Sequence, residues 1–263
     1  MNGADPLVRE LDRWEALGRR ATLWLRDDDA CRDSPPLRRL LALAGEHDVP
    51  VAIAAIPAAV DATLDDAIAH CGRATLVQHG YAHRNHAPPG ERSAEFGPGR
   101  HLHVRLDELR RGRERLAHAF GARFEPVLVP PWNRLADDVL PHLPGARFVA
   151  LSRFGPRAAS EAAACLPQTN AHVDPIAWRR DRQFVGTDAA VERLTAHLRA
   201  RRERACDADE PTGLLTHHLA FGDAAWRFVD DLLALTRRHP AVAWLDVAQA
   251  FAPATLATCA RSA

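Results

Sequence analysis

Short apolar runs alternate with helical patterns along almost the whole chain, and this alternation restricts the fold more than any other feature of the sequence. Seven runs are predicted to be strands, at Ala21–Arg26, Val51–Ile56, Ala74–Gln78, Pro126–Val129, Arg147–Leu151, Gly213–Thr216 and Val242–Leu245. Amphipathic patterns predict helices at Pro35–Glu46, Ala62–His70, Val104–Phe120, Leu135–His142, Ala189–Arg204 and Ala224–Arg238. Strands that alternate with helices form parallel sheets, so the pattern indicates an α/β protein, either a barrel or an open wound sheet.

The length and composition are those of a single globular domain. The chain has 263 residues, of which 47% are hydrophobic and 26% charged, and one α/β barrel commonly takes about 200–250 residues. No linker rich in Gly, Ser and Pro divides the chain. The loops Ala87–Arg100 and Arg153–Pro175 are therefore interpreted as insertions over an active site, and we expect one catalytic domain spanning residues 1–263.

The charge balance argues against nucleic acid and membranes as partners. The 34 basic residues, all of them arginine, balance 34 acidic residues, so no long-range attraction to phosphate backbones or anionic lipid is expected. The longest apolar stretch, at 49–60, contains two prolines and is too short for an integral membrane segment. Five scattered cysteines without a C-x-x-C pair, and no export signal near Met1, favour a cytoplasmic protein with reduced thiols.

Polar side chains follow two of the predicted strands. Asp27, Asp28 and Asp29 come directly after the first strand, and His79 and His83 come after the third. The carboxyl ends of parallel strands meet at one edge of a sheet, so these groups are expected to lie close together. Two histidines and one carboxylate that leave coordination positions open form a catalytic type of metal site. A structural role is the alternative, with Asp29 as the cap of the next helix.

Two further strand ends add groups suited to catalysis. The turn after the fourth strand carries Trp132 and Asn133 behind two rigid prolines, and His217 and His218 follow the sixth strand. A histidine suits general acid catalysis because its pKa lies near the operating range. Either histidine could instead be a buried side chain that bonds to the backbone.

The order of these residues resembles the five motifs of the polysaccharide deacetylases, the NodB-homology fold of carbohydrate esterase family four. Those motifs are written Thr-Phe-Asp-Asp, His-[Ser/Thr]-x-x-His, Arg-x-Pro-[Tyr/Trp], an Asp-to-Trp segment, and Leu-x-His. The match runs from about residue 21 to residue 218 and so covers most of the chain. The resemblance implies a distorted (β/α)7-type barrel and a metal-dependent enzyme that removes acetyl groups from sugars.

The resemblance also implies roles for the acids and histidines. The catalytic base of the family falls on Asp27, and its metal ligands fall on Asp28, His79 and His83. Because a third acid, Asp29, stands where the family has Gly, a shift by one residue remains open: Asp28 would then be the base and Asp29 the ligand.

The remaining motifs place the other parts of the site. The backbone N–H of Trp132, beside Asn133, matches the group that holds the oxyanion, and His217 matches the catalytic acid. Asp174, followed by Trp178, matches the residue that orients this acid.

Two positions depart from the family pattern. Gly80 stands where the family has Ser or Thr, and Val129 stands where the family has the arginine that supports the base. Arg26 and Arg134 are the candidates to replace that arginine.

The sequence therefore predicts a hydrolase that deacetylates an N-acetylated sugar or polysaccharide precursor. A divalent ion, with Zn²⁺ favoured, would activate its bound water, Asp27 would act as base and His217 as acid. The partner would be a carbohydrate or a sugar conjugate, and a cytoplasmic location favours a lipid-linked or nucleotide-linked sugar. The alternatives are a metal-dependent hydrolase of a non-sugar amide, or a catalytically inactive carbohydrate-binding protein on the same fold.

Overall fold

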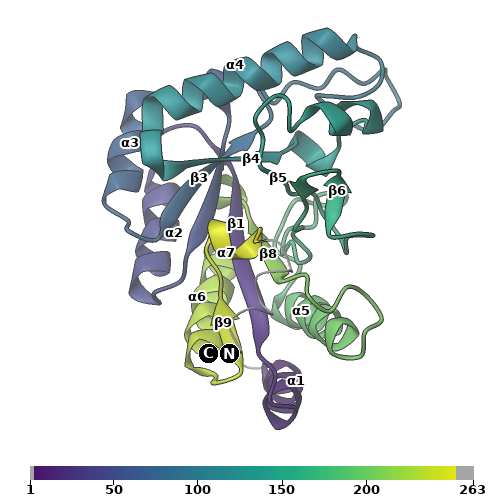
Figure 1. Ribbon diagram of the computed structural model, residues 1–263. Coiled ribbons are helices and arrows are strands. Elements are labelled where there is room, and N and C mark those ends of the chain that lie inside the picture. The colour runs from purple at the N-terminus through teal and green to yellow at the C-terminus, as the bar shows by residue number, and fades with distance from the viewer. Residues whose placement is uncertain (1–2, 253–263) are drawn as a thin grey trace, which may run out of the picture.

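A single curved sheet of seven parallel strands forms the centre of the protein (Figure 1). The computed structural model describes residues 3–252. The sheet order is β5-β4-β3-β2-β1-β8, with β9 paired to β1. Its strands are β1 (Ala21–Ala30), β2 (Val51–Ala55), β3 (Ala74–His79), β4 (Phe124–Val129), β5 (Ala150–Leu151), β8 (Thr212–Thr216) and β9 (Val242–Trp244). The predicted α/β class with a parallel sheet is thus confirmed, and each predicted strand has its counterpart.

Helices surround the sheet (Figure 1). They are α1 (Asp5–Ala16), α2 (Pro35–Glu46), α3 (Ala62–Ala69), α4 (Leu102–Phe120), α5 (Thr187–Arg202), α6 (Asp223–Arg238) and α7 (Val247–Ala250). Side-chain caps mark the starts of α2, α3 and α7. In α2, for example, the Ser34 hydroxyl accepts a hydrogen bond from the backbone N–H of Leu37, and Pro35 occupies the first turn.

Three regions differ from the sequence predictions. The helix predicted at Leu135–His142 is a 3₁₀ segment, Asp137–His142, and contains Pro141, which has no N–H to donate. The strand predicted at Arg147–Leu151 is reduced to β5, because Arg147 lies in a turn with a positive φ of 62°. Helix α1 and a short antiparallel hairpin of β6 (Glu161–Ala163) and β7 (Leu166–Pro167) were not predicted.

The barrel is distorted because an irregular segment takes the place of a strand between β5 and β8. Residues 168–173 connect the two sides through isolated parallel bridges, Leu151 to Gln168 on one side and Val173 to Leu214 on the other. This segment belongs to the loop that was interpreted as an insertion. It therefore completes the wall of the barrel and leads directly to Asp174.

The alternation of side chains along β1 divides it between two cores. Leu23 and Leu25 belong to the large core under the surrounding helices, whereas Trp24 belongs to a smaller core on the inner face of the sheet. There Trp24 packs edge-on against Phe251, which follows α7, with ring centroids 5.5 Å apart. By the same alternation, Arg26 continues the inner face toward the carboxyl end of the strand.

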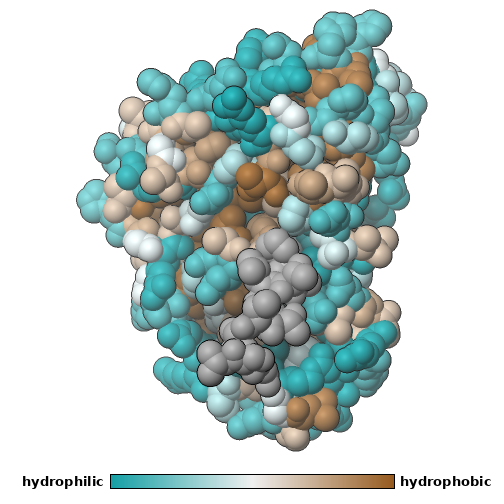
Figure 2. All heavy atoms as spheres, in the orientation of Figure 1, coloured by the Kyte–Doolittle hydropathy of each residue, from teal (hydrophilic) through white to brown (hydrophobic). Residues whose placement is uncertain are grey.

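The face shown in Figure 2 is mainly hydrophilic, with hydrophobic residues scattered among the hydrophilic ones. None of the described helices is both long and apolar enough to cross a lipid bilayer. Four cysteines lie within the described residues and all are free thiols, whereas Cys259 lies outside them.

Candidate active site

A bulge in β1 brings two consecutive acidic side chains into one cavity. In a regular strand neighbouring side chains point to opposite faces. Between Asp27 and Ala30, however, β1 has one residue more than its partner β2, and Asp29 has a positive φ of 75°. Such a bulge redirects a side chain. As a result, both Asp28 and Asp29 line the cavity at the carboxyl ends of the strands.

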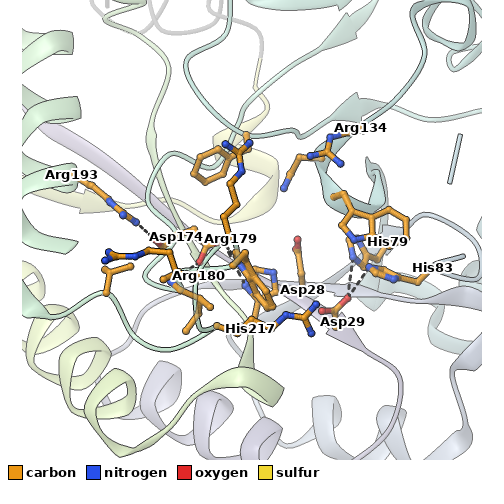
Figure 3. A pocket seen from close by; sticks show the side chains of 18 of the residues that line it. Asp28, Asp29, His79, His83, Arg134, Asp174, Arg179, Arg180, Arg193 and His217 are labelled. Atoms are coloured by element: carbon orange, nitrogen blue, oxygen red, sulfur yellow. Dashed lines mark hydrogen bonds and ion pairs between the residues drawn. The ribbon is translucent and has the colours of Figure 1, made fainter. Parts of the chain in front are cut away.

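The carboxylate of Asp29 lies against both histidines of the third predicted strand end. Its Oδ1 is 3.2 Å from Nε2 of His79 and 3.3 Å from Nε2 of His83 (Figure 3). These three residues offer donor atoms that all lie within 4.8 Å of one another. The structure thus groups His79 and His83 with Asp29 rather than with Asp28, which corresponds to the shifted assignment that the sequence left open.

The two histidines differ in their surroundings. His79 is buried and its Nδ1 lies 3.0 Å from the carbonyl of Val129, so Nδ1–H can donate to that carbonyl and Nε2 is the ring nitrogen that faces Asp29. Burial alone would lower the pKa of His79, but the charges of Asp28 and Asp29 outweigh it and raise that pKa. Burial lowers the pKa of His83 and favours its neutral form, the form that binds metals.

A buried glutamate shapes the loop that carries His83. The backbone N–H groups of Tyr81, Ala82 and Arg84 donate to the Glu95 carboxylate, at 3.0, 2.7 and 3.4 Å. Glu95 is 1% exposed and comes from the loop 87–100. Sequence analysis missed it, because a single glutamate inside a predicted loop carries no recognisable spacing.

The same glutamate explains why residue 80 is glycine. Gly80 has a positive φ of 57°, and a Cβ at this position would lie 2.5 Å from Cδ of Pro131 and would overlap the Glu95 carboxylate. A Ser or Thr side chain, as the family motif has, finds no space here. The departure from the motif is therefore a packing requirement.

Gly80→Ala is expected to lower the free energy of unfolding by about 3 kcal/mol, from backbone strain together with overpacking. Gly18→Ala is the matched control, because Gly18 has a similar φ of 61° but nothing within 4 Å of its Cβ position. It is expected to cost only about 1 kcal/mol. Urea unfolding of both variants measures the difference in the free energy of unfolding. Equal losses in the two variants would show that the clash of the new Cβ with Glu95 and Pro131 costs nothing.

Asp28 lies beside the metal-ligand candidates but is held by Arg26. The fully buried guanidinium of Arg26 contacts both oxygens of Asp28, at 2.9 and 3.0 Å. It also donates to the Ser152 hydroxyl and to Oδ1 of Asn133, each at 2.8 Å. Arg26 is therefore the candidate that contacts an acid of the cavity, in place of the motif arginine for which this chain has Val129. Arg134, the other candidate, donates to the backbone carbonyl of Ser93.

Asp27 points away from this cavity and is fully buried. Its Oδ1 accepts hydrogen bonds from the Thr216 hydroxyl at 2.8 Å and from the backbone N–H of His218 at 3.0 Å. Its Oδ2 lies 2.5 Å from Nδ1 of His218. Burial lowers the pKa of His218, but the charge of Asp27 and this hydrogen bond outweigh it and raise that pKa. Asp27 thus connects β1 to the end of β8 and is not among the residues that line the cavity.

His217 faces the cavity from the opposite side. Its Nδ1 is buried without a hydrogen-bond partner and lies 4.0 Å from Oδ2 of Asp174. The indole of Trp178 packs edge-on against the His217 ring, with centroids 4.7 Å apart, and donates from Nε1 to Asp174 at 2.7 Å. Burial raises the pKa of Asp174. Asp174 and Trp178 thus lie next to the His217 imidazole.

A cavity of about 790 Å³ joins these groups (Figure 3). Trp132 and Asn133 form part of its wall, next to His83, whose ring centroid lies 4.5 Å from that of Trp132. Asp29, His83, Trp132 and Asn133 all have positive φ although none is glycine. Backbone strain of this kind concentrates at functional sites, where the surrounding structure holds it.

The fold is that of the polysaccharide deacetylases. It matches a protein from Mycobacterium smegmatis assigned to the polysaccharide deacetylases, at 15% identity over 88% of each chain with a TM-score of 0.62. It also matches the peptidoglycan deacetylase PdaC from Bacillus subtilis, at 12% identity over 88% of this chain and 90% of that chain, with a TM-score of 0.55.

A third match is a family 4 acetyl xylan esterase from Clostridium thermocellum in complex with a cobalt ion. It is 10% identical over 87% of this chain and 90% of that chain, with a TM-score of 0.51. No protein-family model matches the sequence, and no curated protein matches it. At these identities the likeness establishes the fold, as the sequence motifs implied.

Proposed function

We propose that the protein is a divergent member of the polysaccharide deacetylase superfamily and hydrolyses the acetamido group of an N-acetylated sugar at a divalent metal ion. The observation that carries this proposal is the convergence of Asp29, His79 and His83 in the same cavity as Asp28 and His217. The matched structures are deacetylases and esterases of polysaccharides, one of them with cobalt bound, which supports the reaction class.

The residues of this group fit a catalytic metal ion. Two imidazole Nε2 atoms and one carboxylate oxygen provide three ligands and leave further positions for water and substrate. The donor set suits zinc, iron or cobalt, and zinc is the ion we favour. When bound, such an ion supplies Lewis acidity, which polarises an acetyl carbonyl and acidifies water.

The other residues supply the proton transfers. Asp28, fixed by Arg26, would accept the proton of the attacking water. The backbone N–H of Trp132 would donate to the developing oxyanion, and each such donor lowers a barrier by about 3 kcal/mol. His217, oriented by Asp174, would donate a proton to the leaving nitrogen, since an amine leaves poorly without one. This assignment replaces Asp27 as base and Asp28 as ligand.

Release of acetate from a panel of N-acetylated sugars and oligosaccharides tests the proposal. We expect release from at least one sugar, loss of activity after chelation, and recovery when Zn²⁺ or Co²⁺ is added back. Reaction of non-sugar amides alone would favour the other hydrolase class. Sugar binding without any acetate release, at full metal content, would favour the inactive binding protein.

A further inference from the structure

Five arginines line the cavity outside the candidate metal centre. They are Arg134, Arg179, Arg180, Arg182 and Arg193. Three of them, at positions 179, 180 and 182, lie in a tight turn that is closed by the backbone bridge between Ile176 and Phe184. Arg193 donates to the backbone carbonyl of Asp174, and in the view of Figure 3 Arg134 is drawn on the side of His79. The proposed deacetylation assigns no role to any of these guanidinium groups.

The positive charge of these arginines is not balanced within the cavity. Of the acids that line it, Asp28 is paired with Arg26, and Asp29 and Asp174 lie against histidines.

Within residues 3–252, Arg179, Arg180 and Arg182 form no ion pair with a carboxylate. Arg193 and Arg134 donate to backbone carbonyls, which carry no net charge. Burial, together with the like charges of neighbouring arginines, lowers the pKa of Arg134. Several arginines that line one cavity and have no carboxylate partner attract an anion.

The start of α5 adds to this positive wall. Val185 and Ala189 line the cavity on either side of the first residue of the helix, Thr187, and the N-cap residue Gly186 provides no side-chain cap. The uncapped N–H groups of a helix start attract anions. Asp188, the acid of this turn, lies beside Gly3 and is not among the cavity residues.

We propose that the substrate carries a phosphoryl group, which these arginines bind while its acetamido group lies at Asp29, His79 and His83. The inference rests on the proposed function and narrows its substrate to a phosphorylated or diphosphate-linked N-acetylated sugar. A guanidinium binds phosphate through two parallel hydrogen bonds, and several guanidinium groups match a doubly charged phosphate better than a single carboxylate. Trp178, which is 40% exposed and lines the same cavity, offers a surface for the sugar ring.

Calorimetric titration of the metal-loaded full chain tests the inference without relying on turnover. The probes are N-acetylglucosamine, its 1-phosphate, the uridine diphosphate form, a prenyl diphosphate-linked form, and N-acetylmuramic acid as the carboxylate analogue. We expect at least one phosphorylated probe to bind tenfold or more tightly than the neutral sugar, and the affinities of the three forms identify the source of the phosphate. Binding should weaken as salt rises.

The double variant Arg179→Ala/Arg180→Ala is expected to lose about tenfold in affinity for each arginine that contacts the phosphate, with unchanged affinity for the neutral sugar. Arg110→Ala, an exposed arginine of α4, is the matched control and should change nothing. Equal binding of neutral and phosphorylated sugars, preference for the carboxylate probe, or an unaffected double variant would overturn the inference. Tight phosphate binding without acetate release from any bound probe would instead contradict the proposed deacetylation.

Discussion

Asp29→Ala is expected to lose the bound divalent ion, whereas Asp28→Asn is expected to keep it and to lose turnover. Asp29 is the carboxylate beside both imidazoles, so its removal leaves two ligands. Asp28 is held by Arg26, and loss of a general base typically slows a reaction by about 10²–10⁴-fold. Metal content after gel filtration and the rate of acetate release measure the two effects separately.

The assignment with Asp27 as base and Asp28 as ligand predicts a different outcome, in which Asp28→Asn loses metal and Asp29→Ala retains it. The Asp27→Asn variant is a second test that distinguishes the two assignments of base and metal ligand. Because Asp27 contacts His218 and Thr216, we expect this variant to unfold at lower urea concentration. Its folded fraction should retain the metal ion. Loss of turnover with unchanged stability would restore Asp27 as the base.

His217→Ala is expected to lower kcat by about 10²–10⁴-fold with little change in substrate affinity, because the imidazole acts on the leaving group. The comparison of two substrates makes the test specific. An amide nitrogen needs a proton to leave, whereas an activated aryl acetate leaves without one. The variant should therefore lose far more activity on the N-acetyl sugar than on the aryl ester.

His218→Gln is the control for His217, since His218 is buried against Asp27 and lies outside the cavity. It is expected to reduce stability and to leave the turnover of the folded protein largely unchanged. Equal losses on amide and ester in His217→Ala would show that His217 has another role, such as substrate binding.

The sequence predicted the parallel sheet and the strand ends that carry the site, because hydrophobic periodicity and position along a strand are local properties. It did not determine which two of the three consecutive acids line the cavity, or which of these two lies against the histidines. The directions of these side chains depend on a bulge in β1 opposite β2. A bulge is defined by the pairing of two strands, so the sequence of β1 alone does not predict it. Arg26 was one of two candidates for the missing arginine, and its place on the inner face of β1 follows from the alternation that begins at Trp24.

Other features depended on contacts between distant segments. The Glu95 carboxylate accepts a hydrogen bond from the backbone of the loop that carries His83. No motif of the sequence includes both Glu95 and that loop. The arginines of the cavity come from three segments, and in a chain whose basic residues are all arginine they did not stand out. Helix α1, in contrast, was missed although its sequence carries the signal. Leu7, Leu11 and Trp14 recur at helical spacing on its buried side.

Anomalous diffraction from crystals of the zinc-loaded protein tests the central claim most directly. The account predicts one strong zinc peak at about 2.0–2.2 Å from Nε2 of His79, Nε2 of His83 and a carboxylate oxygen of Asp29, with Asp28 still paired to Arg26. A peak coordinated by Asp28 instead of Asp29, or no peak in this cavity at full metal loading, would contradict it.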